Sequence, residues 1–320
     1  MICFLFVLFV RIHQTEMSPV TVVKSDFNPV KSFLEALGER CCAKPRQATT
    51  IAGLFSTGAT GFARLTMLLS LRGHAVFPIR DTVPRRSPPF MVWAIISLNA
   101  SVFLIELEFP APLFEWFTFQ YGLVPARYSN PIWALRNGLN PTDYWPFLTN
   151  TFLHGGWMHL IGNMWTLWIF GAAVEDRLGP WRFLSFYLAC GVLASIVHFA
   201  FNMLSPIPAL GASGAISGVL GAYALMFPLA RILFVIPIFI FPFFFEFYAF
   251  AYAVAWFILQ IFQGAGGLLA PEIGGSIAWW AHIGGFVAGL SLLSLFRLPQ
   301  RRYRRYYLDE GVLGHGIRGE

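Results

Sequence analysis

Four polar residues interrupt the most apolar part of the sequence and could together do chemistry. Ser213 lies in the run GASGAISG, His282 lies in AWWAHIGG, and His159 precedes Asn163 by four residues. A serine hydroxyl becomes a useful nucleophile when a base takes its proton, and imidazole is the commonest base. Imidazole, amide and backbone N–H groups can stabilise the oxyanion that forms next. These residue types indicate acyl transfer, with Ser213 as nucleophile, His282 as general base, and His159 and Asn163 as oxyanion donors.

The composition determines where such chemistry would take place. Of the 320 residues, 57% are hydrophobic and only 12% are charged, and the mean hydropathy is +0.62. Soluble domains carry about 25% charged residues. We therefore expect an integral membrane protein rather than a soluble enzyme.

The basic residues lie at the two ends of this apolar region. Of the 22 Lys and Arg residues, eleven precede Phe90, six follow from Arg297 onward, and only five lie between. Cytoplasmic flanks of membrane proteins are rich in Lys and Arg, so we expect both termini in the cytoplasm. No basic domain interleaved with aromatic residues is present, which speaks against a nucleic-acid partner. The four cysteines show neither metal-ligand spacing nor a disulfide framework.

The apolar runs predict an all-α membrane protein with a six-transmembrane-helix bundle. A span needs about 20 apolar residues, and we place the spans at about 90–107, 157–174, 183–203, 212–230, 244–262 and 277–296. Pro237 and Pro242 interrupt the run before the fifth span, where we expect a membrane-surface segment. We interpret the remainder as an N-terminal extension, disordered or from a non-native start (1–76), a cytoplasmic lead-in (77–89) and a basic cytoplasmic tail (297–320).

This topology brings the four polar residues to one depth. The second, fourth and sixth spans all enter the membrane from the outer side, and each polar residue lies within about two turns, roughly 10 Å, of its outer end. His159 and Asn163 share one helix face because they are four residues apart. No carboxylate lies at this depth in these three spans, which favours a Ser–His dyad over a triad.

Structural roles would explain the same residues without catalysis. Glycines around Ser213, and the pair Gly285 and Gly289, are typical of close helix packing. His159 and Asn163 could form interhelical hydrogen bonds only. We interpret His154 as an interfacial residue and His198 as a packing residue, since neither has polar company.

At these positions the sequence resembles the rhomboid family of intramembrane serine proteases, over about residues 77–296. Four stretches carry the resemblance: PFLTNTFLHGGWMHLIGN, GAAVEDRLG, GASG and AHIGGFVAG. It implies Ser213 as nucleophile, His282 as base, and His159 and Asn163 as oxyanion residues. Two positions depart from the family pattern. Pro146 follows Trp145 where an arginine is common, and Ser217 stands where some members have an aromatic residue.

The resemblance implies single-pass transmembrane protein substrates that unwind locally in the lipid bilayer and enter past the fifth span. It implies no cofactor and no metal. The glycine-rich residues 264–267 would begin a flexible cap over the site. We expect a bacterial inner membrane, with an organellar membrane as the alternative. The sequence does not indicate an oligomeric state.

Two other functions remain open. A non-catalytic rhomboid-like protein could bind or remodel client transmembrane helices with the same polar pocket. A transporter is less favoured, because the sequence shows no inverted repeat and its polar residues cluster at one depth.

Overall fold

The computed structural model describes residues 77–238, 241–269 and 278–297. The predicted N-terminal extension, and all of the predicted C-terminal tail except Arg297, lie outside the described residues. The chain divides into two compact units, and the described residues of the larger are 78–234, 244–269 and 278–297. This larger unit contains every helix discussed below.

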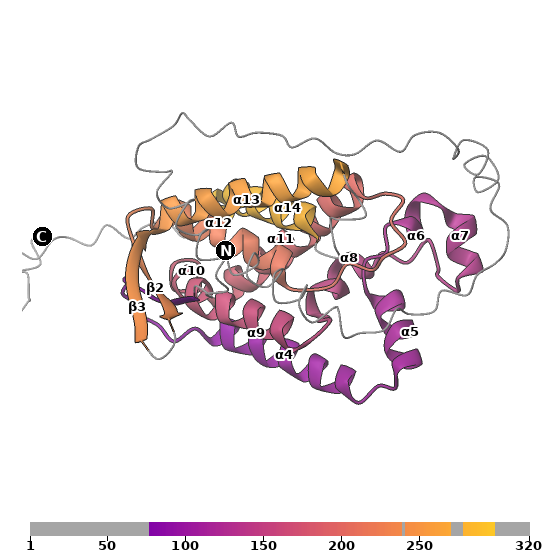
Figure 1. Cartoon of the computed structure of the whole chain (residues 1–320), viewed down its shortest axis with the longest axis horizontal. Coiled ribbons are helices and arrows are strands. Elements are labelled where there is room, and N and C mark those ends of the chain that lie inside the picture. The colour runs from indigo at the N-terminus through magenta and orange to yellow at the C-terminus, as the bar shows by residue number, and fades with distance from the viewer. Residues whose placement is uncertain (1–76, 239–240, 270–277, 298–320) are drawn as a thin grey trace, which may run out of the picture. The chain divides into compact units, whose positions relative to one another are not determined.

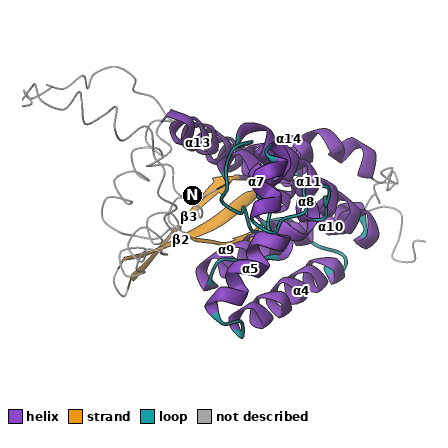
Figure 2. Cartoon of the chain, turned by 90° about the vertical axis from the view of Figure 1, so that its right-hand side faces the viewer, coloured by secondary structure: helices purple, strands orange, loops and turns teal. Residues whose placement is uncertain are grey.

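The described part of the chain is mostly helical (Figure 2). Helices occupy all six ranges where we expected spans: α4 (Phe90–Leu107), α9 (Trp157–Thr166) continued by a π-helical segment (Leu167–Gly171) and α10 (Ala172–Leu178), α11 (Pro180–Phe201), α12 (Ser213–Met226), α13 (Ala249–Leu269) and α14 (Trp279–Phe296). Among the described residues, α4, α11, α13 and α14 are long and apolar enough to cross a membrane. The protein is therefore mostly helical with four candidate spans.

The prediction of an all-α protein is wrong, because three strands are present in the described chain. They are β1 (Phe77–Asp81), β2 (Arg231–Ile238) and β3 (Phe241–Tyr248), in the sheet order β1-β2-β3. Strands β2 and β3 take the place of the expected membrane-surface segment. Proline cannot continue a helix there, while the surrounding Ile, Val and Phe residues favour a strand. As a result, α13 begins at Ala249, later than the expected start near Phe244.

The glycine-rich residues 264–267 also differ from expectation, because they continue α13 as helix. A Cβ atom at Gly264 would lie 3.3 Å from Cε2 of Trp280. The absent side chain therefore lets α14 approach α13 at this point, which is a packing role rather than a flexible one.

Small residues allow α11, α12 and α14 to pack closely. A Cβ atom added to Gly285 would overlap the carbonyl oxygen of Gly214, and one added to Gly289 would overlap that of Gly218. At the same place, a Cβ atom at Gly214 would lie 2.7 Å from Cβ of Ala194 in α11. Close backbone approach of this kind is how membrane helices associate when lipid and protein are equally apolar.

The acidic end of α10 holds the start of α4. Helix α4 has no side-chain cap of its own. Instead, the carboxylate of Glu175 accepts hydrogen bonds from the backbone N–H groups of Met91 (2.9 Å) and Val92 (2.8 Å). A carboxylate at a helix N-terminus satisfies unpaired N–H groups and complements the helix dipole. This contact explains part of the GAAVEDRLG stretch.

Four short helices lie between α4 and α9 and gather at one end of the long helices (Figure 1). They are α5 (Ala111–Tyr121), α6 (Ala126–Ser129), α7 (Pro131–Arg136) and α8 (Pro146–Thr149). Arg127, which is 1% exposed, holds this region together. Its guanidinium donates to the carbonyl oxygens of Asn140 (2.8 Å) and Gln120 (2.9 Å) and to the carboxylate of Asp143 (3.0 Å).

The arrangement around Arg127 bears on the departure at Pro146. Proline fits the first turn of α8, where its missing N–H group has no helical partner to lose. Arg127 supplies a buried guanidinium to the same loop from another position in the sequence.

Candidate active site

Ser213 and His282 meet at the ends of two closely packed helices. Ser213 is the first residue of α12 and His282 lies in the first turn of α14. The distance between Oγ of Ser213 and Nε2 of His282 is 2.8 Å, which is a hydrogen-bond distance. His282 is 3% exposed. The glycine contacts between α12 and α14 begin at Gly214 and Gly285, so the closest approach of the helices lies next to this pair.

The second ring nitrogen of His282, Nδ1, has a partner that sequence reasoning missed. Gln260 of α13 is 2% exposed, and its Oε1 lies 2.8 Å from Nδ1 of His282. Gln260 lies in the fifth span, outside the three spans whose outer ends were predicted to form the site. The available signal was a single amide within the apolar fifth span.

Two tryptophans flank the His282 ring. The ring centroids of Trp256 and Trp279 each lie 6.0 Å from that of His282, Trp279 being edge-on. Ser217, the serine noted as a departure from the family pattern, donates its hydroxyl to the carbonyl oxygen of Ser213 at 2.6 Å. The aromatic surroundings of the imidazole therefore come from α13 and α14 instead of α12.

His159 and Asn163 lie over the backbone that leads into Ser213. A Cβ atom at Gly211 would lie 2.6 Å from Nε2 of His159 and 3.5 Å from Nδ2 of Asn163. Gly211 has a φ of +122°, a conformation that favours glycine. The close contacts and the positive φ both favour glycine at position 211. The polar groups of His159 and Asn163 therefore face bare backbone two residues before Ser213.

The interpretation of His154 as an interfacial residue is wrong, because this side chain is fully buried. Nδ2 of Asn163 lies 3.1 Å from Nε2 of His154. Burial lowers the pKa of His154 to about 3, so its imidazole is neutral at pH 7 and Nε2 can accept from the amide. An amide nitrogen carries two N–H groups, so this bond orients Asn163 and leaves one N–H available. This contact was not predictable from the sequence, because nine residues separate the partners and no regular helix joins them.

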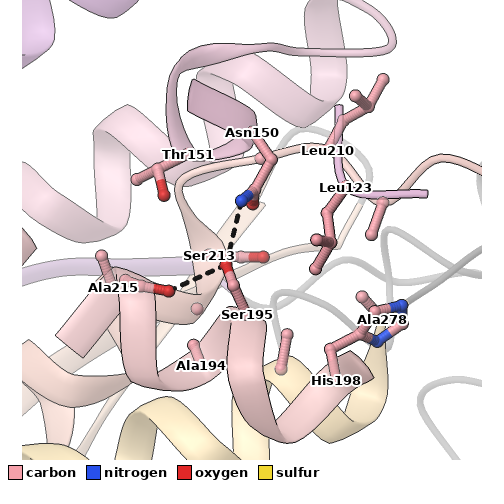
Figure 3. A pocket seen from close by; sticks show the side chains of 15 residues that line it. Leu123, Asn150, Thr151, Ala194, Ser195, His198, Leu210, Ser213, Ala215 and Ala278 are labelled. Carbon is pink, nitrogen blue, oxygen red and sulfur yellow. Dashed lines mark hydrogen bonds between the residues drawn. The ribbon is translucent and has the colours of Figure 1, made fainter. Parts of the chain in front are cut away.

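A small pocket opens beside Ser213 (Figure 3). Asn150 donates its amide to Oγ of Ser195 at 2.9 Å, and Ser195 donates in turn to the carbonyl oxygen of Gly191 at 3.0 Å. His198, interpreted as a packing residue, is 8% exposed and also lines this pocket. A narrow recess with mostly apolar walls and a few polar side chains therefore adjoins the hydroxyl. Among the described residues, no group of three or more His, Cys, Asp or Glu side chains could hold a metal ion.

Comparisons with known proteins agree with the resemblance of the sequence motifs. Residues 141–298 match the family model described as the Rhomboid domain. Rhomboid protease GluP of Bacillus subtilis is 50% identical over 80 residues, which are 25% of this chain and 15% of that protein. Rhomboid protein 1, mitochondrial, of Saccharomyces cerevisiae is 30% identical over 209 residues, 63% of this chain and 52% of that protein.

A third relative is the human presenilin-associated rhomboid-like protein, mitochondrial, which is 35% identical over 99 residues, 30% of this chain and 26% of that protein. The matches thus span at most about half of these relatives' own lengths. The relatives include mitochondrial proteins as well as a bacterial one, so they do not support the expected bacterial inner membrane. Together with the candidate spans, they support a multi-pass integral membrane protein.

Proposed function

Residues 141–298 match the Rhomboid domain and the chain belongs to the rhomboid family, and we propose on that premise that it is an intramembrane serine endopeptidase. The observation that carries the proposal is the 2.8 Å contact between Oγ of Ser213 and Nε2 of His282. A half-buried hydroxyl and a buried imidazole in contact at two helix starts form the minimal nucleophile and base of acyl transfer. The site includes no carboxylate partner for His282, because Nδ1 faces the amide of Gln260.

The proposed reaction proceeds in two halves. Oγ of Ser213 attacks the substrate carbonyl carbon while its proton moves to Nε2 of His282. The tetrahedral intermediate then collapses, the imidazolium gives this proton to the leaving amine, and an acyl ester remains on Ser213. A water molecule, deprotonated by the same imidazole, hydrolyses the ester and restores the serine hydroxyl.

The oxyanion of each intermediate needs donors on the opposite side of the carbonyl from His282. Three groups are suitable: the backbone N–H of Ser213, the free N–H of the Asn163 amide, and the imidazole of His159. Ser213 begins α12, and N–H groups of a first helical turn have no intrahelical partner. Asn163 and His159 both approach the adjoining Gly211 backbone. Such preorganised donors usually make the largest single contribution to acyl-transfer catalysis.

The substrates we propose are transmembrane segments of single-pass membrane proteins. A peptide bond in an intact helix has its carbonyl hydrogen-bonded within the helix, so the segment must unwind before cleavage. Small residues in the substrate would favour unwinding, because glycine is a poor helix former. Both termini of the chain would lie on the cytoplasmic side, with the Ser213 end of the bundle on the other side.

A bundle of six spans is part of the proposal. The helical segments from Trp157 to Leu178 contain 10, 5 and 7 residues, about 33 Å at 1.5 Å per residue, which matches a bilayer core. Helix α12 has only 14 residues, but all those from Gly214 to Ala224 are buried. A helix enclosed by its neighbours needs no long lipid-facing surface, so its short length is compatible with crossing.

The test is cleavage of a generic single-pass substrate in liposomes by the wild type and by Ser213→Ala and His282→Ala. Both variants should lose cleavage, and a serine-reactive fluorophosphonate probe should label the wild type at Ser213. Ser291→Ala is the matched control, since this exposed serine of α14 bonds only to a carbonyl oxygen of its own helix. A folded wild type that neither cleaves nor reacts with the probe would favour the non-catalytic client-binding function.

A further inference from the structure

Gln260 is a buried amide on a helix that carries no other part of the proposed dyad. Its side chain is 2% exposed, and a buried amide is costly unless it is hydrogen-bonded. The partner in the structure is Nδ1 of His282, at 2.8 Å. Trp256 lies four residues earlier on α13 and also faces the His282 ring, with 6.0 Å between centroids. Two side chains on one face of α13 thus contact the imidazole.

The reaction requires one particular tautomer of His282. Nε2 must be unprotonated to accept the proton of Ser213, so Nδ1 must carry the ring hydrogen of the neutral imidazole. Nδ1–H then donates, and the group that faces it has to accept. Oε1 of Gln260 is such an acceptor. The rest of the ring faces aromatic surfaces, since Trp256 and Trp279 flank it.

We propose that Gln260 is a positioning residue that holds His282 in the tautomer and orientation needed by Ser213. The proposal deepens the proposed protease function and rests on it. Gln260 contacts Nδ1 of His282, whereas Ser213 contacts Nε2, so Gln260 acts through the imidazole. In the transition state both ring nitrogens carry hydrogen, and Oε1 continues to accept from Nδ1. Being an amide, it fixes the ring without adding a negative charge.

The kinetic test compares Gln260→Met with Gln260→Glu. Methionine keeps a similar length but offers no oxygen, so Nδ1–H is left buried without an acceptor. That loss corresponds to a roughly 5- to 150-fold decrease in kcat, with KM nearly unchanged because Gln260 does not touch the substrate. Glutamate restores an acceptor at the same place and should keep kcat within about threefold of the wild type.

Gln263→Met is the matched control, since Gln263 lies one turn further along α13 and is only half buried. It should leave kcat unchanged. Thermal unfolding of each variant separates a catalytic effect from a loss of structure. Wild-type kcat in a folded Gln260→Met variant would overturn the proposal.

A second readout does not depend on proteolysis. Nitrogen chemical shifts of 15N-labelled histidine distinguish protonated from unprotonated ring nitrogens. The proposal expects Nδ1–H at His282 in the wild type and a mixture of tautomers in Gln260→Met. Wild-type His282 with hydrogen on Nε2 would overturn it, even if no variant folds. A wild type with the expected tautomer but no cleavage would instead count against the protease function and leave the positioning contact standing.

Discussion

Replacing Gly285 with alanine tests whether the packing of α12 against α14 sets the distance between Ser213 and His282. The added methyl group would overlap the carbonyl oxygen of Gly214, the residue directly after Ser213. The overlap involves backbone on both sides, so no side chain can rotate away to relieve it. The two helices must therefore separate where they meet.

The size of the separation follows from contact distances. A carbon atom and a backbone carbonyl oxygen stay about 3.3 Å or more apart even in close contacts, so the helices would move apart by roughly 1.4 Å. His282 lies three residues before Gly285, on the same side of α14. The 2.8 Å contact between Ser213 and His282 would then stretch to roughly 4.2 Å, beyond a useful hydrogen bond. A misplacement of about 1 Å in an active site can reduce the rate roughly 100-fold.

The assay measures kcat on a reconstituted single-pass substrate together with the midpoint of thermal unfolding. Gly266→Ala is the control, because a Cβ atom there has no neighbour within 4 Å. We expect Gly285→Ala to lose about 100-fold in kcat and to unfold at lower temperature, and Gly266→Ala to behave as the wild type. Unchanged kcat and unfolding midpoint in Gly285→Ala would refute the view that this contact sets the catalytic distance.

Two further predictions concern stability. Arg127→Met should lower the free energy of unfolding by about 3 kcal/mol in mixed micelles, because it leaves Asp143 and two carbonyl oxygens without their cation. His154 has a folded-state pKa of about 3, below its ordinary value of 6.5, so the unfolded chain binds the proton more tightly. Burial of the neutral imidazole therefore costs the protein no stability above pH 6.5. Between pH 6.5 and 3, this residue decreases the free energy of unfolding by about 1.4 kcal/mol for each pH unit that the pH falls. His154→Asn should remove that part of the pH dependence.

Each of these predictions has a comparison that can contradict it. Arg136 is exposed in the same loop, and Arg136→Met should change the free energy of unfolding by about 0.5 kcal/mol or less. Equal effects of Arg127→Met and Arg136→Met would show that the buried guanidinium does not hold the loop. For His154, identical pH slopes in the wild type and His154→Asn between pH 6.5 and 4 would contradict burial of a neutral imidazole.

Much of the fold was predictable because apolar length is a strong signal. The first span was expected at about 90–107, and α4 occupies Phe90–Leu107. Pro237 and Pro242 indicated that the run from Ile232 to Phe262 is not one helix and predicted a membrane-surface segment before the fifth span, but the sequence did not indicate strands β2 and β3. Proline excludes the helix, whereas forming a strand depends on neighbouring strands that local sequence does not reveal.

The candidate site was likewise predictable from the sequence only in part. The types and depths of Ser213, His282, His159 and Asn163 were readable from the sequence, because a polar residue in an apolar span is rare and alternating topology orders their depths. The direct contact between Ser213 and His282 depends on the glycine packing of α12 and α14, for which the sequence supplied only the glycines. Their roles as nucleophile, base and oxyanion donors remain predictions.

The sequence by itself determined that this is a membrane protein with one polar cluster in the rhomboid pattern, since hydropathy and motif spacing are local properties. Only the tertiary structure decided that Gln260 and Trp256 face His282, and that His154 is buried against Asn163. Lipid and protein interior are equally apolar, so an apolar helix does not show in its sequence which face turns inward. That rotation is fixed by contacts between helices, and with it the partners of the imidazole.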